Sequence, residues 1–139
     1  MFAATFENIE ARTKRIQLGS GIKAALLPKK TRGGKVELRL NFHWGDEKSL
    51  QGKDKIAELT AALLQRGTTK KSYQDIQDLE NQLKSQISIS GGAEGFSLHI
   101  ETLRDKLPAA LELAAEILRS PSLPAKQLEL IKQEQLAYH

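Results

Sequence analysis

The pattern of hydrophobic and polar residues predicts three strands in the first third of the chain. Residues 13–18 and 22–27 are short apolar-rich runs separated by a glycine turn, which is typical of a β-hairpin. Residues 35–44 then alternate strictly between apolar and polar side chains. Successive side chains of a strand point to opposite faces, so this segment is predicted to be a strand with one buried face. The residues of that face are Val36, Leu38, Leu40, Phe42 and Trp44.

After residue 52 the apolar residues recur at helical spacing, and four helices are predicted. The first contains residues 56–63 and ends at Gly67. The second begins after Ser72, which is a serine N-cap with a carboxylate three residues later. The third covers residues 107–118, and the fourth opens with Pro124 at its first position and continues to the end of the sequence.

A second hairpin is predicted between the second and third helices. Ile87 and Ile89 alternate with polar residues before the glycine-rich segment 91–95, and residues 96–100 alternate after it. A phosphate-binding loop would open a helix, whereas these glycines are followed by a strand, so a hairpin turn is favoured. Hairpins and segregated helices together predict an α+β fold, with a mostly antiparallel sheet and helices packed on one face.

The composition is that of an ordinary globular chain that can bury a core. It has 139 residues, of which 40% are hydrophobic and 27% charged. The absence of cysteine excludes a disulfide scaffold, a thiolate zinc site and a cysteine nucleophile. The longest apolar runs, such as residues 61–64, are far shorter than the ~20 residues of a membrane span. Residues 1–6 do not read as a signal peptide.

The charge is unevenly distributed, which raises a binding function as an alternative. Residues 1–71 hold 15 basic and 7 acidic side chains, whereas residues 72–139 hold 6 and 10. A basic half can attract nucleic acid or an acidic partner. The basic loop at residues 29–35 has Phe42 and Trp44 as its nearby aromatics, and both are predicted on the apolar strand face rather than as stacking platforms. A solvated polar surface is therefore favoured over nucleic-acid binding.

The histidines do not form a recognisable metal motif. His43, His99 and His139 are each more than five residues from another histidine. The first two fall on the polar faces of predicted strands, and His139 ends the chain, so we expect plain surface residues. A peptidase whose site is assembled from residues distant in sequence remains an open alternative, since such sites are built in space.

Five short segments at the joints between the predicted elements carry a family resemblance. They are residues 21–28, 44–47 (Trp-Gly-Asp-Glu), 64–68 (Leu-Gln-Arg-Gly-Thr), 107–113 and 120–124 (Ser-Pro-Ser-Leu-Pro). In order and composition they resemble the insulinase and pitrilysin family of zinc metallopeptidases, which have an inverted HxxEH motif. The resemblance runs from about residue 9 to the end. It implies one half-like unit of the LuxS and processing-peptidase type of α+β fold.

The zinc motif of that family is missing from this chain. In the family, HxxEH lies on the helix before the Gly-Thr pair, where two histidines bind zinc and the glutamate activates water. Counting back from Gly67 places these positions at Glu58, Ala61 and Ala62, and the third ligand, a later glutamate, aligns near Tyr138. Alanine has no lone pair to offer a metal. The resemblance therefore implies no catalytic residue, no metal ligand and no cofactor in this chain.

The function that the resemblance implies is that of an inactive peptidase domain. It is most like the second half of a bacterial two-copy zinc peptidase, or its inactive partner subunit. Such a domain pairs with a zinc-bearing homologous domain or subunit, completes the wall of a substrate chamber and helps to bind an extended peptide, in part by strand addition. Zinc is expected only in the partner copy.

The resemblance also implies an incomplete domain. Residues 1–8 are expected to be a lead-in segment, and residues 9–139 to be about the first two-thirds of one family copy. A face left uncovered by the missing part would favour self-association. Bacterial relatives are often exported to the envelope, so the resemblance points to the periplasm, a compartment that no residue here specifies.

Overall fold

The computed structural model describes residues 2–138, apart from the side chain of Glu47. The chain divides into two compact units, with the boundary between Gly34 and Lys35. The expected lead-in, residues 1–8, ends inside a helix, α1 (Phe6–Arg12), which the sequence pattern did not predict. The expected division into a lead-in and one partial domain stays a prediction.

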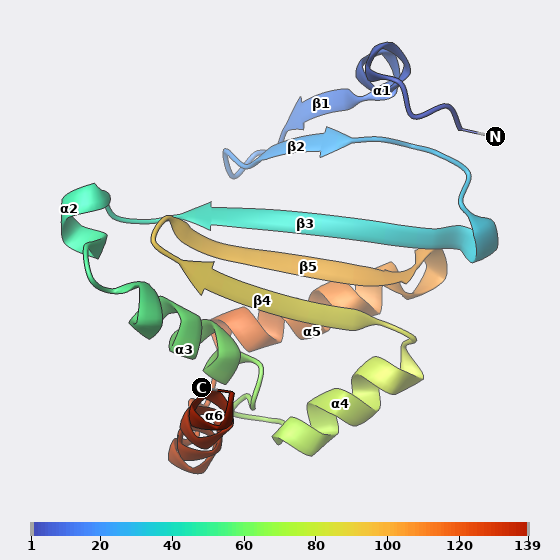
Figure 1. Cartoon of the computed structure of the whole chain (residues 1–139). Helices are drawn as coiled ribbons and strands as arrows, with labels where there is room; N and C mark the ends of the chain where they lie inside the picture. Colours follow the sequence, from blue (N-terminus) through green and yellow to red (C-terminus); the bar gives the residue numbers. More distant parts are fainter. Residues whose placement is uncertain (1, 139) are drawn as a thin grey trace. The chain divides into compact units, whose positions relative to one another are not determined.

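The first unit contains α1 and the predicted hairpin. The Thr5 side chain caps α1 by accepting a hydrogen bond from the Asn8 backbone N–H at 3.2 Å. Strands β1 (Lys14–Gln17) and β2 (Lys23–Leu26) pair antiparallel. The turn between them uses Gly21 at φ 87°, a conformation that glycine adopts without steric cost. The hairpin at residues 13–27 is therefore confirmed (Figure 1).

The second unit is built on a three-stranded antiparallel sheet (Figure 1). Its strands are β3 (Lys35–His43), β4 (Gln86–Gly92) and β5 (Gly95–Leu103), in the order β3-β5-β4. Leu38 of β3 and Ile87 of β4 both lie opposite Ile100 of β5, which is fully buried. This register collects the apolar side chains of all three strands on one face, as the alternation along each strand predicts. Phe42 is an exception, since it is 37% exposed.

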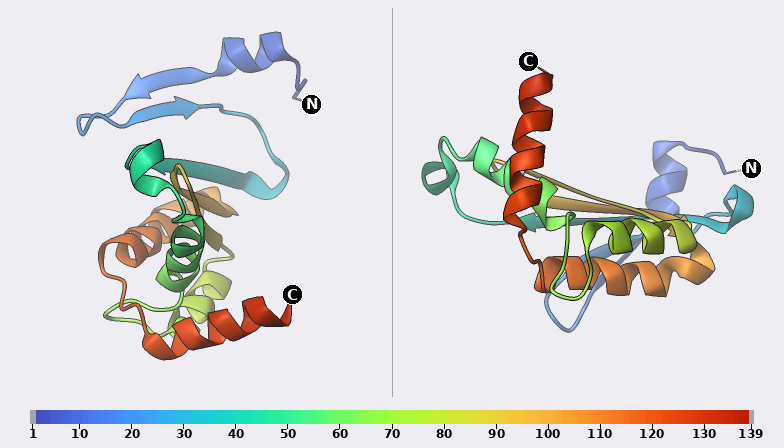
Figure 2. Two further views of the ribbon diagram at one scale, coloured as in Figure 1. Left: turned by 60° about the vertical axis from the view of Figure 1, so that its left-hand side comes forward. Right: turned by 90° about the horizontal axis from the view of Figure 1, so that it is seen from below.

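Five α-helices follow or connect these strands. They are α2 (Glu47–Leu50), α3 (Asp54–Leu64), α4 (Tyr73–Gln82), α5 (Leu107–Arg119) and α6 (Ala125–Ala137). The last four are the predicted helices, although α6 begins at Ala125 with the extended Pro124 as its N-cap rather than its first residue, whereas α2 lies before residue 52, where no helix was predicted. In Figure 2, right, α4 and α5 lie on the same side of the sheet and α6 extends away from them. Within residues 2–138, no helix is long and apolar enough to cross a membrane.

The core lies between the apolar face of the sheet and the helices. It is aliphatic: its buried members are Ala61, Leu64, Ile76, Ile87, Ile89, Leu98, Ile100, Ala110, Leu113, Ala114 and Ile117. The spacing of Ala110, Leu113, Ala114 and Ile117 places them on one stripe of α5. The predicted α+β fold, with helices packed on an antiparallel sheet, is therefore confirmed.

A small polar network holds the loop after α3. The Thr68 hydroxyl donates to Glu116 Oε1 at 2.7 Å, and Lys71 Nζ lies 2.7 Å from Glu116 Oε2. Glu116 belongs to α5, so this network ties the loop to the helix that covers the sheet. A Cβ atom at Gly67 would lie 2.8 Å from Ser122 Oγ, so the serine hydroxyl would have to rotate away if this glycine were replaced. The network fixes the direction in which the chain leaves α3.

Candidate functional site

The four positions that align with the family's zinc site carry no set of metal ligands in the structure. Glu58 lies on the exposed side of α3, where its carboxylate is 2.9 Å from Lys55 Nζ. Ala61 is 1% exposed and belongs to the core, whereas Ala62 is partly buried and lines a cavity. Tyr138 is the C-cap of α6 and is 91% exposed. Two methyl groups, one ion-paired carboxylate and one exposed phenol do not provide the donor set of a zinc site.

The histidines also lie apart from one another on the described surface. His43 is exposed at the end of β3. His99 is in the middle of β5 on the polar face of the sheet, and its Nε2 is 4.0 Å from Glu37 Oε2 of β3. His139 lies outside the described residues. Among residues 2–138, no three His, Cys, Asp or Glu side chains are grouped so that they could hold a metal ion.

The basic loop has an aromatic neighbour that the sequence reasoning overlooked. Lys29 Nζ and the Arg12 guanidinium each lie 5.5 Å from the centroid of the Phe2 ring. Both side chains therefore form cation–π contacts with the Phe2 ring within the first unit. Trp44, one of the two aromatics considered beside the loop, packs edge-on against Phe96 at 3.8 Å between ring centroids.

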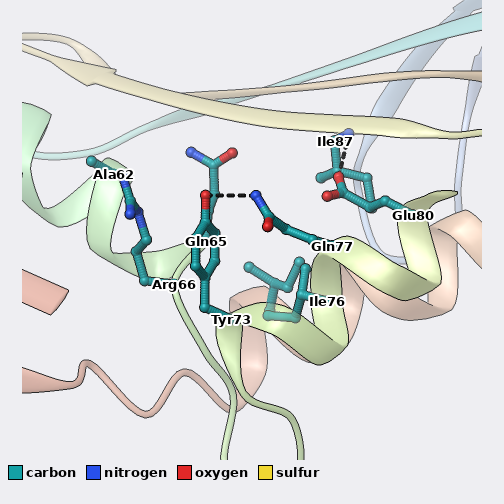
Figure 3. Close-up of a pocket in the computed structure, with 9 residues that line it drawn as sticks. Ala62, Gln65, Arg66, Tyr73, Ile76, Gln77, Glu80 and Ile87 are labelled. Atoms are coloured by element: carbon teal, nitrogen blue, oxygen red, sulfur yellow. Dashed lines mark hydrogen bonds between the residues drawn. The ribbon is translucent and has the colours of Figure 1, made fainter.

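A cavity of about 200 Å³ lies beside α3, where α3 and α4 meet β4 (Figure 3). Its lining combines aliphatic side chains with amide, aromatic and charged groups. The lining residues are Ala62, Gln65, Arg66, Tyr73, Ile76, Gln77, Glu80, Ile87 and Ile117. One degenerate motif position, Ala62, is thus part of the cavity wall, and its methyl group leaves room that a larger side chain would fill.

The cation at one end of the cavity is already paired. The Arg66 guanidinium stacks on the Tyr73 ring at 4.6 Å, and its Nη2 is 3.2 Å from the carboxylate of Glu134 on α6. Its Nη1 donates to Gln127 Oε1 at 3.4 Å. Gln77 Nε2 donates to the Tyr73 hydroxyl at 2.8 Å, which holds the aromatic ring in place. Figure 3 shows Arg66 beside Ala62, with Glu80 at the opposite end.

The carboxylate at the other end is not paired with a cation. Glu80 Oε1 accepts a hydrogen bond from the backbone N–H of Ile87 at 2.8 Å (Figure 3). Among the ion pairs of residues 2–138, none includes Glu80. Burial raises the pKa of the Glu80 carboxyl group, and the hydrogen bond from Ile87 opposes this only in part. Glu80 is therefore a partly buried acid with space in front of it.

The same side chains close the outer edge of β4. Glu80 accepts from the Ile87 N–H, and Gln65 Nε2 donates to the Ile89 carbonyl oxygen at 3.0 Å. Further along, Gly91 lies so close to the Ala57 carbonyl oxygen that a Cβ atom would not fit. Two backbone groups that another strand could otherwise use, the Ile87 N–H and the Ile89 carbonyl, are therefore bonded to side chains of α4 and α3, and Gly91 lies against α3.

Sequence reasoning found α3 but not the cavity. Tyr73, Gln77 and Glu80 follow at helical spacing on one side of α4, which is a usable signal for a shared face. The sequence gives no sign that this face meets Gln65 of α3 and the edge of β4, because those contacts join segments distant in the chain.

Comparisons by sequence find no relative. No profile of a known protein family matches the chain. No curated protein matches it either.

Solved structures are similar to the chain in fold. The inactive domain of a peptidase M16 from Pseudomonas fluorescens is 25% identical, with a TM-score of 0.75 over 90% of this chain and 30% of that chain. A protease from Helicobacter pylori is 22% identical, with a TM-score of 0.66 over 89% of this chain and 29% of that chain. The ferredoxin protease FusC, in complex with Arabidopsis ferredoxin, is 18% identical, with a TM-score of 0.70 over 94% of this chain and 15% of that chain.

The chain thus spans less than a third of each of these three proteins. Its residues form an antiparallel sheet covered by helices in the same arrangement as a domain described as inactive. The chain has the α+β fold of M16-type peptidase domains.

Proposed function

We propose that this chain is part of a non-catalytic M16-type peptidase domain that works together with a zinc-bearing copy. The observation that carries the proposal is the composition of α3, where Glu58, Ala61 and Ala62 stand at the motif positions. The likeness to a peptidase M16 inactive domain supports the same conclusion. Ala61 packs in the core, so this segment of α3 serves as packing surface.

The zinc-bearing copy is the partner in this proposal. It lies on the same polypeptide or on a second subunit, and the two copies enclose the substrate chamber. Zinc is bound by the partner, and this chain contributes wall and binding surface. Exposed apolar side chains on the helices, such as Ile56 at 62% and Leu136 at 74%, are available for contacts with the rest of such an assembly.

Peptide binding in this proposal uses main-chain hydrogen bonds at a sheet edge. The outer edge of β4 is covered by Gln65, Glu80 and α3, which leaves β3 as the strand to which a peptide adds. Strand addition depends on backbone groups and is therefore tolerant of peptide sequence. The ferredoxin bound to FusC is an example of a protein held by a protease of this fold.

The first test is zinc content combined with peptide cleavage. The purified chain is expected to hold zinc well below one atom per chain and to cleave no peptide, with or without added zinc. Adding the homologous protein that carries HxxEH is expected to give a complex in size-exclusion chromatography and cleavage that a chelator abolishes. One zinc per chain with chelator-sensitive cleavage by the chain alone would overturn the proposal.

A further inference from the structure

We propose that the cavity between α3, α4 and β4 binds the cationic end of a basic side chain, with the Glu80 carboxylate as its ion-pair partner. The proposal rests on the proposed function only in assigning that side chain to a peptide. The cation site itself follows from the cavity, its lining and the position of Glu80.

The hydrogen bond to β4 does not account for the charge of Glu80. The Ile87 N–H needs one acceptor, and an amide oxygen at the same position would serve it as well as a carboxylate. A partly buried carboxylate without a cation carries a desolvation cost that a glutamine would avoid. A cation in the space in front of the carboxylate would offset this desolvation cost through an ion pair.

The other polar groups of the cavity also suit a cation with several N–H donors. Gln65 uses its N–H groups on the carbonyl oxygens of Ala61 and Ile89, which leaves its own carbonyl oxygen as an acceptor. Gln77 uses an N–H on the Tyr73 hydroxyl and likewise keeps a carbonyl oxygen. These acceptors and the carboxylate complement a guanidinium group, which offers five donors.

The size of the cavity and its apolar walls fit one side chain rather than a larger ligand. Its volume of about 200 Å³ is below the roughly 300–1,000 Å³ of cofactor and drug sites. Ile76, Ile87 and Ile117 provide aliphatic surface for the methylene stem of an arginine or lysine. Arg66, the cation within the lining, is paired with Glu134 and stacked on Tyr73 at the far end, so its charge is compensated where it lies.

The test is titration of the ¹⁵N-labelled chain with butylguanidinium and with butylurea, its neutral isostere, followed by amide chemical shifts. The Ile87 amide is the reporter because it donates directly to Glu80. We expect saturable shifts of this amide with butylguanidinium at concentrations up to about 50 mM, a range that covers weak fragment binding. Butylurea should leave the amide unchanged.

Two variants decide the assignment. Glu80→Gln keeps an acceptor for Ile87 and removes the charge, so affinity for butylguanidinium should fall roughly tenfold or more. The matched control is Glu58→Gln, which removes one negative charge from the exposed side of α3 and should bind as the unmodified chain does. If Glu80→Gln does not fold, Gln77→Leu removes a neutral acceptor from the cavity wall without a charge change and should weaken binding instead.

The proposal is overturned by the absence of saturable shifts, by equal shifts with butylurea, or by unchanged affinity in Glu80→Gln or, where that variant does not fold, in Gln77→Leu. Equal weakening in Glu58→Gln would also overturn it, because the effect would then follow net charge. None of these results bears on zinc content or on pairing with a catalytic copy. A failure of the cation site is thus distinguishable from a failure of the proposed function.

Discussion

Replacing Glu116 with glutamine should destabilise the chain in a pH-dependent manner. Its carboxylate receives a hydrogen bond from Thr68 at 2.7 Å and pairs with Lys71 at 2.7 Å, with the Glu116 side chain 20% exposed and that of Lys71 29% exposed. The amide of glutamine keeps an acceptor for Thr68 but loses the ion pair. A hydrogen bond to a charged group contributes about 1.5–3 kcal/mol and a neutral one about 0.5–1.5, so the expected loss in the free energy of unfolding is about 1–2 kcal/mol.

The sign of the pH dependence follows from the lowered pKa of Glu116. The hydrogen bonds from Lys71 and Thr68 hold the pKa of the folded carboxyl group below its ordinary value of 4.5. The unfolded chain therefore binds the proton first as pH falls, and the stability that the carboxylate provides is present above pH 4.5 and lost below it. The difference between the two proteins should be largest near neutral pH and should shrink as pH falls below 4.5 and through the lowered pKa of the folded carboxyl group.

The assay is urea denaturation of both proteins at several pH values. The matched control is Glu112→Gln, which changes an exposed carboxylate one turn earlier on α5 and should leave the unfolding free energy unchanged. A Lys71→Met background should reduce the effect of Glu116→Gln, since the ion pair is then already absent. Equal stability of Glu116→Gln and the unmodified chain near neutral pH, or a difference that does not shrink as pH falls below 4.5, would refute the reasoning.

Two further substitutions test the sheet and the core. Gly95→Ala should destabilise the chain by about 2 kcal/mol or more, because a Cβ atom would collide with the Phe42 carbonyl oxygen, and the backbone there has φ 142°. Gly92→Ala, which has open space around it, is the control, and similar melting temperatures for both would contradict the assigned β3–β5 register. Ile117→Ala removes a side chain that is 1% exposed and should cost about 2–5 kcal/mol in urea denaturation. Leu111→Ala, at 39% exposure on the same helix, should cost clearly less.

The long periodic elements were predictable from the sequence because the spacing of apolar side chains in each one shows which face is buried. The alternation from Lys35 to His43 and the helical spacing along α5 each describe one buried face, and both elements form as predicted. Short elements such as α1 and α2 were missed. Each has seven residues or fewer and is defined by a cap, Thr5 or Asp46, rather than by a period.

Of the candidate site, the motif positions on α3 could be predicted from the sequence, whereas the cavity and Glu80 could not. The alanines at the motif positions could be found by counting back from Gly67, and the structure adds that Ala62 lines the cavity beside α3. The role of Glu80 could not be predicted. It depends on an N–H of β4 that points away from β5 and on a cavity that four separated segments enclose.

The contacts at the outer edge of β4 determine which edge of the sheet in the second unit is left for a further strand. In the function proposed above, a strand that extends this sheet adds beside β3, since the opposite edge already donates to Glu80 and accepts from Gln65. A peptide, a later strand of the same polypeptide and a second copy of this chain would therefore be mutually exclusive at β3. Occupancy of this edge then depends on concentration, and a dimer formed through it would act as a competitive inhibitor of peptide binding.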